Sequence, residues 1–196
     1  MKLKYFFILC SISLVISCST LQRNSKTSGK TNEQTTVENV RNPSSQPTWA
    51  QEELYVSEST LGVSAHVEIL KDQSPVQGLI LADAKAQEHF KKQLSLKLAA
   101  WLVTLNKNPN ITVTKLKTFA ENLINNDLSG ALLIDKRFYN QTESQYQCYS
   151  LATLTASELK QKISEKINKD FKDAQDLLIE LEASWGQFLT SFPQGT

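Results

Sequence analysis

A long apolar stripe at helical spacing between Leu79 and Leu105 is the feature that most limits the fold of this chain. Apolar side chains recur every three or four residues there, whereas Lys85, Glu88 and Lys92 lie mainly off the stripe. This spacing predicts an amphipathic helix that buries one face over roughly seven turns. The stripe consists of Ala82, Ala86, Phe90, Leu94, Leu98, Leu102 and Leu105. A helix of this length needs a second layer to cover it.

Strand-like segments precede this helix and can supply that layer. The first large aromatic residue of the folded part is Trp49, and residues 54–56, Leu-Tyr-Val, can begin a strand. Residues 61–69 then alternate apolar with small or polar side chains, a period of two that predicts a half-buried strand or hairpin. Residues 71–78, which include Pro75, are typical of a turn or loop.

Further helical and strand-like segments follow the long helix. Residues 106–110 break it, and a shorter helix is expected from about Val113 to Ile124. Residues 131–139 and 145–154 have the aromatic content and alternation of an antiparallel hairpin. The order of these segments predicts an α+β fold, in which a small antiparallel sheet is packed by helices.

One long helix is expected to end the chain. Thr155 is a good N-cap, and Glu158 three residues later completes a capping box. The apolar stripe that follows contains Leu159, Ile163, Ile167, Phe171, Leu178, Leu181, Trp185 and Phe188. Because Trp185, Phe188 and Phe192 lie beyond the length that covers a small sheet, they either pack in the core against a second helix or meet an oligomer partner. Core packing is the favoured alternative.

The first seventeen residues have the parts of a secretory signal. Lys2 and Lys4 give a basic start, an apolar run covers residues 5–16, and the small Ser17 precedes Cys18. The run is shorter than the roughly 20 apolar residues of a membrane-spanning helix. We therefore expect a leader that is removed, not a membrane span.

Residues 15–18, Val-Ile-Ser-Cys, resemble the lipobox of bacterial lipoproteins. In that motif a diacylglyceryl group is attached to the cysteine sulfur before the signal peptidase cuts in front of it, so Cys18 is the expected lipidation site. Such proteins carry two or three fatty acyl chains, palmitate among them, and several chains anchor durably where one does not. Ser19 stands where an aspartate would retain a lipoprotein in the inner membrane, which predicts the outer membrane in a two-membrane bacterium.

The lipidated residue and a flexible linker are expected to occupy residues 18–46. This segment has almost no large apolar side chains after Leu21, so burial cannot offset the entropy lost on ordering. The expected organisation is a signal peptide (1–17), the linker (18–46) and one α+β domain (47–196). Removal of Lys2 and Lys4 changes the formal net charge from +1 to −1, so no basic field for nucleic acid remains.

Cys148 is the only thiol expected in the mature chain, because Cys10 leaves with the leader and Cys18 is acylated. An internal disulfide is thereby excluded. Cys148 lies in a strand-like stretch with no histidine near it in sequence. These surroundings favour a buried, inert side chain over a nucleophile or a disulfide between chains.

The sequence predicts no catalytic, cofactor or metal site. His66 and His89 are the only histidines, too few for a zinc site without several carboxylates. Residues 62–66, Gly-Val-Ser-Ala-His, lack the final glycine of a nucleophile elbow, and strand alternation explains them better. The six glycines are isolated, so no glycine-rich phosphate loop is present.

The clustered acidic residues are expected to be solvent-exposed surface residues, not catalytic groups. The pairs Glu52 with Glu53 and Asp170 with Asp173 are expected to be solvated instead of acting as acid–base pairs. The stretch from Asp170 to Glu182 is rich in carboxylates, for which a solvent-facing helix side is favoured over an acidic face for a partner.

Several motifs together resemble the Lpp-twenty family, small bacterial lipoproteins whose domain also resembles part of the flagellar assembly protein T. The motifs are the lipobox, Pro47-x-Trp49, the strand at 54–56, the alanines Ala82, Ala84 and Ala86, and the strand 149–152 running into Thr155-x-x-Glu158. The resemblance covers roughly residues 47–170 and implies a compact α+β domain without enzymatic activity. The chain departs from the family pattern at residues 57–59, where a glycine is common, and at Gln87, where an arginine is frequent.

Three functional hypotheses follow from these features. The first is a non-enzymatic lipoprotein, held on the membrane by its N-terminal lipid, whose domain binds or scaffolds another envelope protein. The second is an activator of a peptidoglycan synthase, since some such activators combine a lipid anchor, a spacer and a small domain. The third is an envelope hydrolase, which would require a clustered histidine–carboxylate pocket.

Overall fold

The structure is a computed structural model that describes residues 36–38, 46–171 and 174–195. The predicted signal peptide, Cys18, most of the predicted linker and Asp173 lie outside these residues. The elements run in the order β1 (Thr36–Glu38), β2 (Tyr55–Ser57), β3 (Thr60–Leu70), α1 (Pro75–Leu105), α2 (Val113–Asn122), the π-helical turn η1 (Leu123–Asp127), β4 (Leu133–Gln141), β5 (Gln145–Thr155), α3 (Ala156–Asp170) and α4 (Gln175–Thr190).

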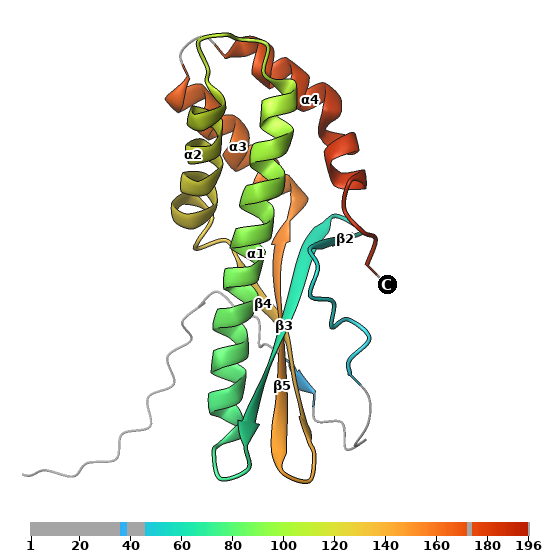
Figure 1. The fold of residues 1–196 in the computed structure, drawn as a ribbon. Coiled ribbons are helices and arrows are strands. Elements are labelled where there is room, and N and C mark those ends of the chain that lie inside the picture. The colour runs from blue at the N-terminus through green and yellow to red at the C-terminus, as the bar shows by residue number, and fades with distance from the viewer. Residues whose placement is uncertain (1–35, 39–45, 172–173, 196) are drawn as a thin grey trace, which may run out of the picture. The chain divides into compact units, whose positions relative to one another are not determined.

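The sheet has the strand order β1-β4-β5-β3-β2 (Figure 1). Strands β4, β5, β3 and β2 are antiparallel, whereas β1 adds to β4 in parallel over three residue pairs. The predicted α+β fold with an antiparallel sheet packed by helices is therefore confirmed. The predicted strands at 61–69 and the hairpin of 131–139 with 145–154 are also confirmed, with boundaries shifted by one to two residues.

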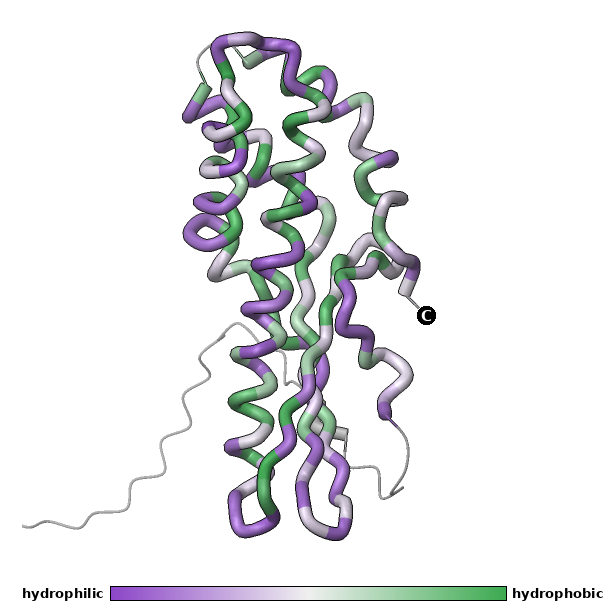
Figure 2. The backbone as a smooth tube through the Cα atoms, in the orientation of Figure 1, coloured by the Kyte–Doolittle hydropathy of each residue, from purple (hydrophilic) through white to green (hydrophobic). Residues whose placement is uncertain are grey.

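Helix α1 lies along one face of the sheet, here called the inner face (Figure 1). The predicted stripe is buried, since every member from Ala82 to Leu102 is at most 1% exposed. Opposite it, β3 contributes Leu61, Val63 and Ala65 to the same core cluster. Figure 2 shows the resulting pattern, in which hydrophobic and hydrophilic stretches alternate along α1 and the loops at the tip of the sheet are hydrophilic.

The start of α1 corrects the prediction of a loop at 71–78. Helix α1 begins at Pro75, and the Ser74 hydroxyl accepts a hydrogen bond from the backbone N–H of Val76. Proline suits the first helical position because its fixed φ is helical and its missing N–H would have no intrahelical partner there. Pro75 thus begins a helix instead of marking a loop, and Gly78 lies inside that helix.

Helices α2, α3 and α4 gather with the C-terminal half of α1 at one end of the sheet (Figure 1). The predicted helix from 113 to 124 is confirmed as α2 followed by the π-helical turn η1. At the start of α3 the Thr155 hydroxyl accepts from the N–H of Glu158, as the capping box predicts.

The prediction of one long C-terminal helix is wrong. Phe171 has an extended backbone, and the chain resumes as a separate helix, α4. Neither glycine nor proline lies between Asp170 and Gln175, so the local sequence does not announce the break. The break lets α4 return towards α1, where Phe188 stacks on Trp101 with ring centroids 4.3 Å apart. The packing of α4 on α1 therefore favours two separate helices over one continuous helix.

Residues 46–54, which we call the strap, lead from the second face of the sheet, here called the outer face, to the edge of β3. The N–H of Ser64 donates to Gln51 O at 2.8 Å, and the Gln93 side chain holds the backbone of Glu52 and Leu54 through two hydrogen bonds of 2.8 Å. Ala50 packs on Phe138 and Tyr149 of the outer face, with Trp49 beside them. The strap therefore covers Phe138 and Tyr149 on the outer face, and its last residue, Leu54, joins the core beneath α1.

Both lateral edges of the sheet carry short added segments. On β4 this is β1, three residues within the range expected to be linker, which pair with Lys136, Arg137 and Phe138. On β2 the segment is the C-terminal stretch 193–195, whose backbone exchanges two hydrogen bonds with Val56.

Candidate functional site

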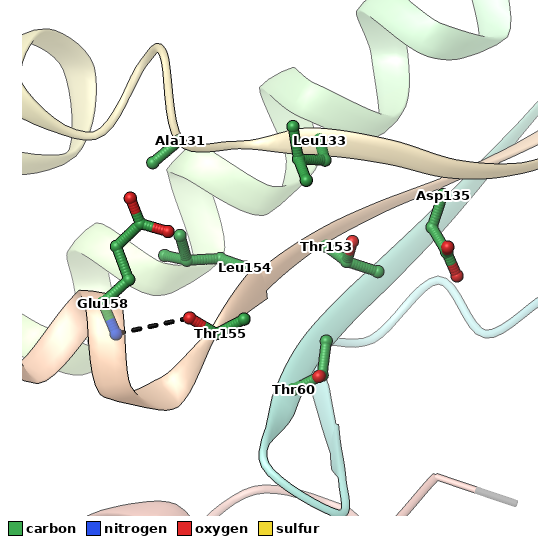
Figure 3. Close-up of a pocket in the computed structure, with 8 residues that line it drawn as sticks. All are labelled: Thr60, Ala131, Leu133, Asp135, Thr153, Leu154, Thr155 and Glu158. Carbon is green, nitrogen blue, oxygen red and sulfur yellow. Dashed lines mark hydrogen bonds between the residues drawn. The ribbon is translucent and has the colours of Figure 1, made fainter. Parts of the chain in front are cut away.

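A concave site lies on the outer face, at the end of the sheet nearest α3. Its cavity volume is about 190 Å³. It is lined by Thr60, Ala131, Leu133, Asp135, Thr153, Leu154, Thr155 and Glu158, and we call it the threonine groove (Figure 3). Strands β3, β4 and β5 and the first turn of α3 therefore each contribute to one depression.

A β-bulge brings Asp135 into this groove. Ile134 pairs with Ala152 and Lys136 pairs with Leu151, so Asp135 is an extra residue without its own partner on β5. A bulge of this kind changes the direction of a side chain relative to plain alternation. In Figure 3 the Asp135 carboxylate and the Glu158 carboxylate lie towards opposite sides of the groove, with Thr153 between them.

The threonine side chains reach the groove because of strand periodicity. Thr60 pairs directly with Thr155, and Thr153 is two residues before Thr155 on β5, so all three share the outer face. The Thr155 hydroxyl already accepts the N–H of Glu158. A hydroxyl both donates and accepts hydrogen bonds, so Thr60 and Thr153 can serve either kind of ligand group.

The groove combines negative charge with an aliphatic wall. The Asp135 and Glu158 side chains form no ion pair with any other residue that the structure describes. Burial raises the pKa of the Tyr55 phenol, and the nearby Asp135 carboxylate raises it further. Leu133 is 58% exposed at the rim of the groove. The arrangement can bind a ligand by hydrogen bonds, charge and apolar contact.

The histidines predicted to be too few for a metal site lie on different elements. His66 on β3 contacts Glu52 of the strap, Nδ1 to Oε1 at 2.8 Å, and stacks on Tyr149. His89 lies on α1. Among the described residues no group of three or more His, Cys, Asp or Glu side chains is arranged to hold a metal ion.

The prediction that residues 62–66 belong to a strand is confirmed. All five lie within β3, and each pairs with a residue of β5 from Thr153 to Tyr149. Ser64 is buried in this continuous strand and does not stand on a sharp turn. The elbow interpretation therefore has no structural counterpart.

Cys148 is buried, as predicted. Its Sγ lies 3.6 Å from the carbonyl oxygen of Pro75, and burial raises the pKa of the thiol to about 11. The thiolate is the reactive form, so this environment suppresses nucleophilic chemistry. A Cβ at Gly78 would overlap Cys148 Sγ, which shows how closely α1 approaches β5 there.

The C-terminal aromatic residues pack inside the domain. Phe188 and Phe192 are each 3% exposed, and Trp185 lies against Trp101 and Phe188. The favoured alternative, core packing against a second helix, is confirmed for Phe188 and Phe192. Of the acidic residues between 170 and 182, Glu180 pairs with Lys107 and Glu182 pairs with Lys160 on the surface.

One polar cluster was not predicted from the sequence. Asp83 of α1 accepts hydrogen bonds from Arg137 at 2.6 and 3.0 Å and from the Ser150 hydroxyl at 2.5 Å. The hydrogen bond to Asp83 raises the pKa of Arg137. Because the cluster joins α1 to β4 and β5 beneath the helix, we interpret it as a structural tie. The only sequence signal was a carboxylate beside the apolar stripe.

The chain was compared with protein-family models, with curated proteins and with solved structures, and none of the three comparisons finds a match. The resemblance to the Lpp-twenty family therefore stays a prediction. In the described part of the chain no helix is both long and apolar enough to cross a membrane.

Proposed function

We propose that this chain is a lipid-anchored bacterial envelope protein whose α+β domain is a non-enzymatic binding module. The observation that carries the proposal is the sequence Val-Ile-Ser-Cys at residues 15–18, preceded by a basic start and a short apolar run. Two or three acyl chains on Cys18 would hold the protein on a membrane, since each buried CH₂ contributes about 0.8 kcal/mol.

The domain supports a binding role through the threonine groove. The groove presents two carboxylates, threonine hydroxyls and an exposed leucine side chain in one depression. These groups recognise a ligand without supplying an activated nucleophile, and the one described thiol, Cys148, is buried on the inner face. The proposal does not depend on the family resemblance.

Metabolic labelling with an alkyne fatty acid tests the anchor directly. Cells expressing the full chain should incorporate the label, and Cys18→Ala should abolish it because no other sulfur occupies the lipobox. Cys10→Ala is a matched control, since it changes another cysteine of the predicted leader region and should leave labelling intact. Labelling that survives Cys18→Ala, or a mature protein with an unmodified N-terminus, would overturn the proposal.

Membrane fractionation extends this test to the outer membrane assignment. We expect the labelled chain to sediment with outer membranes. Cys18→Ala should instead keep its leader and stay with the inner membrane, because the signal peptidase cuts only after the cysteine is acylated. Recovery of both forms in the same fraction would contradict a lipid anchor at Cys18.

A further inference from the structure

The threonine groove has the dimensions and lining of a site for one aliphatic side chain with a polar head. Its volume is about 190 Å³. Leu133 of β4 and Ala131 of the preceding turn form an apolar side, and Thr153 and Thr60 lie across from them (Figure 3). A ligand that fits both sides must therefore be amphipathic along its length.

The charge of the groove selects the sign of the polar head. Asp135 and Glu158 contribute two negative charges to the lining, and no basic side chain lines the groove. Two basic residues of the contributing elements are engaged elsewhere, with Arg137 bound to Asp83 and Lys160 bound to Glu182. Lys136 is exposed beside Asp135 and does not line the groove. A cation complements this lining, whereas an anion is repelled.

We propose that the groove receives the side chain of a lysine presented by a partner polypeptide. The four-carbon stem packs on Leu133 and Ala131, and the ammonium donates to Asp135 and to the hydroxyl oxygens of Thr153 and Thr60. A lysine head suits this set because its three N–H donors diverge from one point. The inference deepens the binding role proposed above and rests on it for the source of the partner.

An NMR titration of the full chain with the peptide acetyl-Ala-Lys-Ala-amide tests the proposal. We expect saturable shifts of the backbone amides of Thr60, Asp135 and Thr153 at low ionic strength, with a Kd on the order of 1 mM for one exposed charge pair with apolar contact. The same peptide with norleucine in place of lysine should bind at least about five-fold more weakly, because it keeps the stem and loses the charge.

Variants of the lining identify the contacts. Asp135→Asn should weaken lysine-peptide binding about five-fold or more, and Glu158→Gln should weaken it less because its carboxylate lies on the other side of the groove. Glu121→Gln, at an exposed position of α2, is the control and should not alter binding. A dispersed amide spectrum confirms that each variant is folded.

Several outcomes would overturn the inference. These are shifts confined to other surfaces, equal binding of the norleucine peptide, and unchanged binding by both Asp135→Asn and Glu158→Gln. Running the titration on the Cys18→Ala chain separates the two proposals. Peptide binding by this chain would uphold the groove whatever the fatty-acid labelling shows. Labelling of the wild-type chain without peptide binding would uphold the anchor and overturn the groove.

Discussion

The two halves of α1 are stabilised in different ways. From Phe90 onwards the helix is enclosed by the sheet and by α2, α4 and η1, in one apolar cluster that holds most of the buried side chains. Before Ala86 the helix covers only strands, and its separate cluster contains just Leu79, Ala82 and Cys148, with partly buried neighbours. One continuous helix thus joins a large core cluster to a small one. We call the part of α1 before Ala86 the thin half, because few side chains are buried beneath it, and the core from Phe90 onwards the thick core.

The thin half of α1 has few buried apolar side chains, but close packing and hydrogen bonds to the sheet also hold it in place. Gly78 allows close approach to Cys148, and Asp83 binds Arg137 and Ser150 across the sheet. Val76, Ile80 and Leu81 in the same half are more than half exposed. Local stability follows the number of buried apolar contacts, so this half should open before the rest of the helix.

Truncation of one core side chain in each half should give the largest difference. Phe90→Ala is expected to lower the free energy of unfolding by about 3–5 kcal/mol, because the side chain is fully enclosed and leaves a large cavity. Leu79→Ala should cost about 2 kcal/mol, the lower end for a leucine, because it lies in the small cluster. Urea unfolding measures both. Equal losses would contradict the division of α1 into a thick and a thin core.

The reactivity of Cys148 measures how often the thin half opens. Burial raises the thiol pKa from 9.0 to about 11, so about 100-fold less thiolate is present at pH 8 in the folded protein than in the unfolded chain. Alkylation read by mass spectrometry of the peptide that contains Cys148 should slow by at least about that factor on folding, because the buried thiol is also shielded from the reagent. Nearly equal rates in the two states would show that α1 frays past Gly78.

The same shift gives a sign for the pH dependence of stability. The folded state binds the thiol proton more tightly than the unfolded chain does. The contribution of this proton to the free energy of unfolding is therefore complete below pH 9 and is lost as the pH rises towards about 11. The pKa values of Tyr55 and Tyr149 are also raised and act in the same direction. Cys148→Ala should therefore reduce the fall in stability above pH 9 without removing it.

Removal of the Asp83 charge should destabilise the thin half moderately. Asp83→Asn keeps the shape of the side chain but weakens its hydrogen bonds to Arg137 and Ser150. We expect the free energy of unfolding to fall by about 1–2 kcal/mol, a moderate loss because the Asp83 and Arg137 side chains are both partly exposed to water. Hydrogen exchange should accelerate mainly in residues 75–86. Glu88→Gln, exposed on the same helix, is the control and should change neither quantity. Acceleration confined to the C-terminal half would contradict the assignment.

The smallest expected effect is a gain at Glu58, outside both halves. Glu58 has a φ of 54° in the two-residue turn between β2 and β3. An L side chain is strained in this region and glycine is not, so Glu58→Gly should stabilise the domain by up to about 1 kcal/mol. Ser59→Gly is the matched control and should not stabilise, because Ser59 does not have a positive φ. Thermal unfolding distinguishes them.

The sequence predicted elements wherever periodicity was long and local. The stripe of α1, the β4–β5 hairpin and the Thr155 cap each depend on spacing within one segment, and the structure confirms them. The sequence did not predict the break at Phe171, because that break depends on the contact of α4 with α1. Likewise β1 has no strand signal of its own and is defined by β4 beside it.

The candidate groove could be predicted only in part. Thr153 and Thr155 share a face by simple alternation, and the capping box places Glu158 near them. Asp135 enters through a bulge, and alternation in the sequence assigns such an extra residue to neither face. Thr60 joins them because β3 pairs with β5, a long-range contact that no local pattern reports.

Short segments of the chain cover part of both edges of the sheet. Exposed strand edges can pair with the strands of neighbouring molecules. Here β1 occupies part of the β4 edge, and residues 193–195 occupy the β2 edge, where a Cβ at Gly195 would overlap the Tyr55 ring. These two segments pair with backbone groups at the sheet edges that would otherwise be open, and so lower the tendency to sheet-to-sheet aggregation.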